Sequence, residues 1–271
     1  MSTSQPAAWS QTQLARLEAF QVERCVDIHC HLLPGLDDGP PTLESSMQLA
    51  QALVEDGITT VMATPHQLGR YDRMNSAELI RAEIQELSSA LASAGIPLEI
   101  LPGGDVRIDE RLPHLLDEGE IGTLADKGRH LLLELPHDFL IDPLPTIELL
   151  DARGIQSIIT HPERYRYLAG KEPMLQSWVQ AGAVIQLTAG SLLGDFGRRA
   201  HAQAWAIVQA NLASLIATDA HDTQHRPPRL SAALAALTEQ LGSETASQLC
   251  LANPLQVYQG TTIASPLRND S

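Results

Sequence analysis

Imidazole and carboxylate side chains recur at the ends of short apolar segments along this sequence. The residues concerned are His29, His31, His66, Asp105, Glu134, His161, Asp219 and His221. Any one of them alone would usually be an ordinary surface or core residue, but their joint placement indicates a common site. Imidazole and carboxylate ligands without thiolate suit divalent Mn, Fe or Zn, and this many carboxylates favours a site with more than one ion.

Spacing within two of these segments sets pairs of ligands on one side of a strand. Side chains two residues apart on a strand point the same way. His29 and His31 form one such pair, with Asp27 on the same face, and Asp219 and His221 form the other. We therefore expect the first and last strands of the domain to contribute two ligands each and, if the strands close into a barrel, to be neighbours.

The three cysteines indicate packing rather than chemistry. Cys30 and Ile28 should share the face opposite the histidines, so Cys30 is expected to be a small buried side chain. Cysteine-dependent phosphatases need an arginine six residues after the nucleophile, and the positions six after Cys25, Cys30 and Cys250 hold His31, Leu36 and Gln256. That mechanism is excluded. Three cysteines also build no disulfide framework, which favours a reducing, cytoplasmic compartment.

Seven apolar segments, most followed by a stretch with helical spacing, predict parallel βαβ units closed into an α/β barrel. The segments are 25–31, 58–66, 98–105, 130–136, 156–161, 183–187 and 213–221. The carboxyl ends of barrel strands share one rim, where active sites of such folds are built. Residues 30 to 50 positions apart in the chain should therefore converge there.

Helix signals support this alternation. Asn75 lies three residues before Glu78, the spacing of a capping box. Glycines stand where four helices should end, namely Gly57, Gly95, Gly154 and Gly182. Asp37 and Asp38 lie in a turn-rich loop after the first segment, and we interpret Asp37 as a turn residue.

We expect one barrel domain over 25–262, an N-terminal extension over 1–24 and a C-terminal tail over 263–271. The extension could form a short amphipathic helix through Leu14, Leu17 and Phe20 that packs on the domain or on a second copy, so a homo-oligomer is possible. Its polar start shows no signal peptide, and no apolar run is long enough to span a bilayer, so we expect no membrane insertion.

Composition fits a globular domain and argues against nucleic-acid binding. The chain has 271 residues, of which 44% are hydrophobic, enough to bury a sizeable core. Its formal charge is -15, so its surface should repel polyanions, and we expect no nucleic-acid partner. An anionic ligand would need a local field that opposes this global charge.

The opening motif then carries a specific resemblance. The stretch 27–39, which reads DIHCHLLPGLDDG, resembles the start of the metal-dependent tyrosine-protein phosphatases of capsule and exopolysaccharide synthesis. These belong to the polymerase and histidinol phosphatase (PHP) superfamily. Further blocks match in order and extend the resemblance over 25–262: ATPH at 63–66, THPERY at 160–165, TAGS at 188–191, TDAH at 218–221 and NP at 253–254.

The resemblance implies a distorted (β/α)7 barrel of the PHP type with a trinuclear, usually manganese, centre, iron or zinc being possible. Carried over by position, its ligands would be His29, His31, Asp38, His66, Asp105, His161, Asp219 and His221. One position departs from the family, which usually has Glu in a Gly-x-Glu motif where this chain has Gly103-Gly104-Asp105. The shorter side chain must be compensated by a backbone that moves inward, by help from Glu134, or by a change in metal preference.

Two arginines match family positions that bind phosphate. Arg164 follows His161 by three residues and Arg226 follows His221 by five. Guanidinium groups suit phosphate through paired, charge-assisted hydrogen bonds. The implied reaction is metal-assisted hydrolysis of a phosphomonoester without a covalent enzyme intermediate. Arg229 lacks this support, and His225 could be a proton donor or only a loop residue.

The resemblance also implies a substrate, the phosphotyrosine-rich tail of a membrane-bound tyrosine kinase that drives polysaccharide assembly. Three alternatives stay open. The chain could be a PHP phosphoesterase acting on histidinol phosphate or a nucleotide, or a zinc amidohydrolase, although the latter commonly needs a strand lysine and Lys127 and Lys171 fall outside the segments. It could also be a non-catalytic, metal-binding regulator of the kinase.

Overall fold

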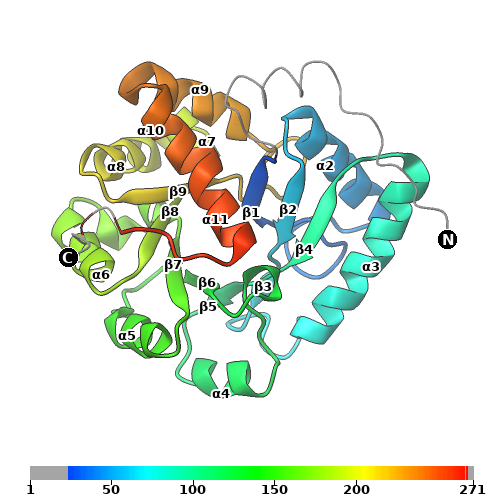
Figure 1. The fold of residues 1–271 in the computed structure, drawn as a ribbon, viewed down its shortest axis with the longest axis horizontal. Coiled ribbons are helices and arrows are strands. Elements are labelled where there is room, and N and C mark those ends of the chain that lie inside the picture. Colours follow the sequence, from blue (N-terminus) through cyan, green and yellow to red (C-terminus); the bar gives the residue numbers. More distant parts are fainter. Residues whose placement is uncertain (1–23, 266, 268–271) are drawn as a thin grey trace.

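Parallel strands surround a common axis, and most of the helices lie outside them (Figure 1). The computed structural model describes residues 24–265 and 267. The strands are β1 (Val26–Cys30), β2 (Thr60–Ala63), β3 (His66–Gln67), β4 (Glu99–Pro102), β5 (Asp105–Arg107), β6 (His130–Glu134), β7 (Gln156–Thr160), β8 (Val184–Thr188) and β9 (Ala213–Ala217). They form two parallel sheets, in the orders β1-β2-β4 and β3-β5-β6-β7-β8-β9.

The helices lie between and around these strands. They are α2 (Leu43–Glu55), α3 (Ala77–Ala94), α4 (Leu112–Asp117), α5 (Leu144–Ala152), α6 (Glu172–Gln180), α7 (Ala189–Leu193), α8 (Gly197–Gln209), α9 (Leu230–Leu241), α10 (Ser243–Ser247) and α11 (Asn253–Gln259). The alternation of strand and helix confirms the predicted parallel α/β fold. No helix of the described part has the length and apolar character that crossing a membrane requires.

The two sheets join through shared segments and through β1 and β9. Segment 58–66 supplies β2 and the start of β3, and segment 98–105 supplies β4 and the start of β5. On the other side, Asp219 N donates to His29 O at 2.8 Å and His31 N donates to Ala220 O at 2.9 Å. The first and last strands are therefore neighbours, as predicted, and the predicted segments follow one another around the axis.

A small apolar cluster takes side chains from strands around the axis. It includes Val26, Leu132, Ile158, Val184 and Leu215. Val257 of α11 also packs in this cluster. Ile263 belongs to it as well and is buried, although the sequence assigned it to the C-terminal tail. The strand residues of this cluster precede the polar strand ends, so an apolar core packs beneath the candidate site.

The predicted alternation along β1 is wrong at Ile28. Ile28 packs in the small axial cluster, whereas Cys30 packs in the larger core between strands and helices. The pairing of β1 with β2 shifts register between Asp27 and Cys30. Asp27 accepts hydrogen bonds from Thr218, just after the neighbouring strand β9, instead of joining the histidines. A local irregularity of this kind re-aims the side chains that follow it.

Helix ends agree with the sequence in part. Gly95 caps α3 in the left-handed conformation, and the other three predicted glycines have positive φ just after helix ends. The α3 N-cap, however, is Ser76, whose hydroxyl accepts from Leu79 N at 3.2 Å. The predicted cap Asn75 is buried and donates its side-chain amide to Leu36 O and His66 O. It links the loop after β1 to strand β3 instead.

The predicted N-terminal helix falls on residues outside the described range. Leu14, Leu17 and Phe20 all precede Arg24, the first described residue. The proposed role of the extension in packing on the domain or a second copy stays a prediction.

Candidate metal centre

The predicted ligands lie together at the carboxyl ends of the strands. Four groups of side chains have ligand atoms within 4.8 Å of one another: His31, Asp38, His66 and His221; His29, Asp105 and His161; His29, His31 and Asp219; and His66, Asp105 and Glu134. The groups share members, so they form one continuous cluster. The parallel fold thus brings together all eight positions carried over from the resemblance, and Glu134 with them.

Hydrogen bonds at Nδ1 turn two imidazoles so that Nε2 faces the cluster. His29 Nδ1 lies 3.0 Å from Gln186 Oε1, and His221 Nδ1 donates to Asp219 O at 3.0 Å. Ligating histidines in proteins are typically oriented by such a bond at the second nitrogen. His29 Nε2 and His31 Nε2 then approach to 3.2 Å, two nitrogen atoms that a shared cation would bring together.

Asp37 orients His31, a role that the sequence did not indicate. Its Oδ2 lies 2.5 Å from His31 Nδ1 and accepts from His66 N at 2.9 Å, while Oδ1 accepts from Gly39 N at 2.9 Å. Burial would raise the pKa of Asp37, but the charge and hydrogen bond of His31 lower it to about 2. The predicted turn is present, and the same carboxylate also fixes a candidate ligand.

The shorter side chain of Asp105 reaches both sides of the cluster. Its Oδ2 lies 3.3 Å from His66 Nδ1, 3.7 Å from His29 Nε2 and 3.9 Å from His161 Nε2. The two preceding glycines let the backbone pass close to its neighbours: a Cβ at Gly104 would overlap Gln67 Oε1. Two features therefore compensate for an aspartate where the family usually has glutamate: the backbone approaches its neighbours closely at Gly104, and Glu134 lies near the same ligands.

Asp219 links the cluster to the two predicted phosphate-binding arginines. Its Oδ1 lies 3.4 Å from both His29 Nε2 and His31 Nε2. Its Oδ2 accepts from Arg164 Nη1 and, at 2.5 Å, from Arg226 Nη2. Burial alone would raise the pKa of Asp219, but Arg226, His29 and Arg164 outweigh it and hold that pKa well below its usual range.

An aromatic ring supports these arginines. The guanidinium carbon of Arg164 lies 4.5 Å from the ring centroid of Phe196, and that of Arg226 lies 5.8 Å from it. Stacking of guanidinium on an aromatic face is favourable and limits its freedom. Phe196 therefore holds both charged groups at the edge of the cluster.

Burial keeps other imidazoles neutral and ready to bind. Desolvation, with Arg164 adding to it, lowers the pKa of His161 to about 4. Desolvation with the charge of His31 lowers the pKa of His221 to about 4 as well. Neutral imidazole is the form that coordinates a metal, so neither group would need to lose a proton near neutral pH.

Buried polar atoms that make no hydrogen bond support metal binding at this cluster. Both carboxylate oxygens of Asp105, Oδ1 of Asp219 and Nε2 of His221 are buried and accept or donate no hydrogen bond among the described residues. Leaving such groups unsatisfied is costly, most of all for carboxylates. Divalent cations would satisfy all of them, and oxygen with imidazole nitrogen is a donor set that suits such ions.

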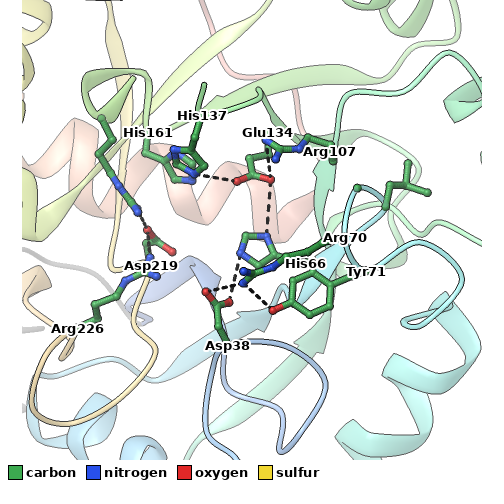
Figure 2. Close-up of a pocket in the computed structure, with 13 residues that line it drawn as sticks. Asp38, His66, Arg70, Tyr71, Arg107, Glu134, His137, His161, Asp219 and Arg226 are labelled. Carbon is green, nitrogen blue, oxygen red and sulfur yellow. Dashed lines mark hydrogen bonds and ion pairs between the residues drawn. The ribbon is translucent and has the colours of Figure 1, made fainter. Parts of the chain in front are cut away.

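The cluster opens into a pocket of about 220 Å³ (Figure 2). Its walls include Asp38, His66, His161, Asp219 and Glu134, so these five candidate ligands face the space that a substrate would fill. Arg164 and Arg226 also line it. Four further lining residues with polar side chains were not singled out as site residues from the sequence: Arg70, Tyr71, Arg107 and His137.

Two of these residues follow predicted ligands closely, which is the signal that could have found them. His137 lies three residues after Glu134, with its Nε2 3.4 Å from Glu134 Oε1. Arg107 lies two residues after Asp105, on the same strand. Arg70 and Tyr71 come from the loop after β3, whose course the sequence pattern does not define.

Several other residues lie outside the cluster. His225 is 85% exposed beside Asp222, as a loop residue would be, and Arg229 pairs with Asp195. Glu163, which precedes Arg164 in the chain, is buried and accepts from Thr188 N at 3.0 Å. His130 is buried without a hydrogen bond among the described residues.

The fold and cluster together define a parallel α/β protein with a candidate metal centre at the carboxyl ends of its strands. A family model described as capsular polysaccharide synthesis, CpsB/CapC, matches residues 25–259. The chain belongs to this CpsB/CapC family.

Relatives support the assignment. The tyrosine-protein phosphatase YwqE of Bacillus subtilis (strain 168) is 35% identical over 222 residues, which cover 81% of this chain and 86% of the relative. The putative tyrosine-protein phosphatase CapC of Staphylococcus aureus is 33% identical, covering 74% and 79%. The resemblance seen in the sequence motifs is thus confirmed.

Solved structures agree with the fold. A structure from the work on B. subtilis YwqE and Streptococcus pneumoniae CpsB, described as unique metal-dependent tyrosine phosphatases, matches with a TM-score of 0.84. It is 32% identical and covers 90% of this chain and 100% of its own. A phosphotriesterase homology protein from Escherichia coli matches with a TM-score of 0.57 at 13% identity, a likeness of fold alone.

Proposed function

We propose that this chain is a metal-dependent tyrosine-protein phosphatase, which hydrolyses phosphotyrosine without a covalent enzyme intermediate. Its relatives carry that name, and the solved structure it resembles is described as metal-dependent. The observation that carries the proposal is the pair Arg164 and Arg226, which meet on Asp219 at the edge of the ligand cluster. A phosphate bound there would lie between two guanidinium groups and the cations.

The proposed ligands are His29, His31, Asp38, His66, Asp105, His161, Asp219 and His221, with Glu134 as a further one. We propose manganese as the natural metal and about three ions per chain, as the family resemblance implies; the oxygen and imidazole donors suit such an ion, and four overlapping groups of donors are consistent with more than one ion. Bound divalent ions supply a water of lowered pKa as nucleophile and positive charge for the phosphoryl oxygens.

The arginines bind and orient the phosphate. Arg226 Nε is buried and donates no hydrogen bond among the described residues, although Nη2 of the same side chain binds Asp219. That free donor can reach a phosphoryl oxygen while the guanidinium keeps its hold on Asp219. Arg164, stacked on Phe196, supplies the second charge. The phenolate leaving group has an ordinary pKa near 10, so the reaction needs no strong general acid.

For the physiological substrate we propose the phosphotyrosine tail of a membrane-bound tyrosine kinase of polysaccharide synthesis, met on the cytoplasmic side. The family description links the chain to capsule synthesis. The open pocket with arginines at its edge suits a flexible tail. Among the alternatives, the amidohydrolase loses support because Lys127 and Lys171 lie outside the strands.

The test is hydrolysis of a phosphotyrosine peptide compared with histidinol phosphate and a nucleotide. We expect the peptide to be preferred, and we expect a chelator to abolish the reaction and manganese to restore it. Arg226→Ala should lower kcat/KM about 100-fold, a typical loss for one charge-stabilising donor. Arg229→Ala is the matched control, because Arg229 pairs with Asp195 away from the ligand cluster.

A preference for histidinol phosphate or the nucleotide would replace the proposed substrate by a small molecule. Equal activity of Arg226→Ala and the wild type would contradict the assignment of phosphate binding. Absence of phosphate release from every substrate, with metal bound, would favour the non-catalytic regulator.

A further inference from the structure

The pocket carries a second pair of arginines that the proposed reaction does not use. Arg70 and Arg107 line the pocket together with Arg164 and Arg226. Figure 2 shows Arg70 and Arg107 on one side of the pocket and Arg226 on the other. Four of the sixteen arginines of a chain with formal charge -15 thus line one small cavity. Three carboxylates line it as well, those of Asp38, Glu134 and Asp219, so what the cavity offers an anionic ligand depends on the guanidinium donors that these carboxylates leave free.

Arg107 is held in place by its surroundings but keeps free donors. Its Nη1 donates to Leu135 O at 2.5 Å and lies 3.6 Å from Glu134 Oε2. Its side chain passes against Gly69, where a Cβ would lie 3.4 Å from both Cγ and Nε. Nε and Nη2 donate no hydrogen bond to any described residue. Since guanidinium has five N–H donors, most remain available to a ligand.

Arg70 is similarly anchored at one end of its guanidinium. Its Nη2 donates to Tyr71 Oη at 2.8 Å and lies 3.1 Å from Asp38 Oδ2. The guanidinium carbon lies 4.7 Å from the centroid of the Tyr71 ring. The side chain is 68% exposed, so it stands at the mouth of the pocket rather than at its floor. Nε and Nη1 have no partner among the residues described.

The positions of these arginines relative to the ligands decide their role. Arg164 and Arg226 contact Asp219, whereas Arg70 and Arg107 approach Asp38 and Glu134 from the side that Figure 2 shows opposite Arg226. A single phosphate bound by Arg164 and Arg226 cannot also accept hydrogen bonds from all the free donors of Arg70 and Arg107. Arg70 and Arg107 therefore face the part of the substrate that extends from the phosphotyrosine across the mouth of the pocket.

We propose that Arg70 and Arg107 form a second anion subsite, which binds an acidic group adjacent to the phosphotyrosine in the same peptide. This inference rests on the proposed phosphatase function and deepens it by naming a feature of the substrate. The ligand is an anionic oxygen group, either the carboxylate of a flanking Asp or Glu or the phosphate of a second phosphotyrosine. Both chemistries suit the planar donors of arginine.

Three peptides that differ only beside one phosphotyrosine separate these possibilities. One has Gln on both sides, one has Glu on both sides, and one has a second phosphotyrosine nearby. We expect kcat/KM of the wild type to be about 10-fold higher for at least one charged peptide than for the neutral one, since hydrogen bonds between charged partners are stronger than those between neutral ones. The gain should appear in KM, because this binding is the same in the ground and transition states.

Variants locate the effect. Arg107→Gln should reduce the ratio of charged to neutral kcat/KM to about 1–2, and Arg70→Gln should reduce it about threefold, because its exposed charge is screened. Arg73→Gln is the matched control: Arg73 lies on the same loop as Arg70, is 87% exposed, does not line this pocket and should leave the ratio unchanged. Because each ratio compares two peptides on one enzyme, a change in the common rate does not affect it.

A preference for only one charged peptide supports the subsite and identifies its ligand as carboxylate or phosphate. Equal kcat/KM for all three peptides in the wild type would overturn the inference, as would a ratio that both Arg107→Gln and Arg70→Gln preserve. Hydrolysis of the neutral peptide reports separately on the proposed phosphatase function, so the two proposals fail in different ways.

Discussion

At the scale of single residues, the candidate centre depends on contacts one step away from the ligands. Asp37 shows this most clearly, since one carboxylate fixes His31 through Nδ1 and also accepts from His66 N. Two candidate ligands on different segments are thereby held in one arrangement. Such supporting groups raise ligand basicity and restrict the ring to one tautomer.

Replacing Asp37 by Asn should therefore weaken metal binding without removing a ligand. We expect manganese affinity to fall about 10- to 100-fold, because the amide keeps the shape but no longer accepts the proton of His31 with a full charge. Calorimetric titration of metal-free protein measures this. Asp109→Asn is the control, as Asp109 pairs with Arg111 outside the cluster. Unchanged affinity in Asp37→Asn would show that His31 is oriented without this contact.

At the scale of elements, the approach of β5 to its neighbours sets how far Asp105 reaches. A Cβ at Gly103 would lie 2.8 Å from Leu124 Cδ2, and one at Gly104 would overlap Gln67 Oε1. Gln67 cannot move aside freely, because its amide donates to Asn75 O at 2.7 Å. The glycine pair thus permits a close strand position that a shorter carboxylate needs.

Gly104→Ala should displace β5 and Asp105 with it. We expect a loss of about 1–3 kcal/mol in the free energy of unfolding, the usual cost of overpacking a core, together with weaker metal binding. Chemical denaturation and metal titration measure the two effects. In Gly122→Ala the new Cβ would lie 3.3 Å from a carboxylate of Asp126, so this control should lose much less. Equal effects in both variants would contradict the role given to close backbone approach.

His130, the first residue of β6, predicts how the stability of the fold depends on pH. Burial, with Arg129 adding to it, lowers the pKa of His130 to about 4 from an ordinary 6.5. The unfolded chain therefore takes up this proton at a higher pH than the folded chain. The stability due to neutral His130 is fully present above pH 6.5 and is lost as the pH falls from 6.5 to 4, by up to about 3 kcal/mol.

His130→Leu should accordingly lose less stability than the wild type between pH 7 and pH 4.5. Urea unfolding in the presence of a chelator measures the free energy of unfolding of both proteins without metal. The candidate ligands titrate in both proteins, so the difference between the two pH profiles reports on His130. Parallel pH profiles for the two proteins would show that His130 contributes nothing to acid sensitivity.

At the scale of the whole molecule, the sequence predicted the features that strand ends and periodicity determine. His29, His66, His161 and Asp219 could be grouped in advance because carboxyl ends of parallel strands share one rim. The role of Asp37, the loop-linking amide of Asn75 and the position of Arg70 could not, since they depend on loop conformations that no period describes. Ile28 was misassigned because the irregularity in β1 leaves no local signal.

The charge distribution of the whole chain is consistent with the proposed phosphotyrosine substrate. A formal charge of -15 disfavours anions in general, while four arginines and the proposed cations reverse the field in one pocket. Selectivity for a phosphorylated tail over other polyanions would follow, because only a group that enters the pocket escapes the global repulsion.

The central claim is that imidazoles and carboxylates from separate strands hold the ions on which phosphotyrosine hydrolysis depends. Its most direct test is elemental analysis of the full chain, combined with activity, as manganese is added back to chelator-treated protein. We predict that about three ions bind per chain and that phosphotyrosine hydrolysis rises with their occupancy. Full activity in protein that retains almost no metal would contradict this claim.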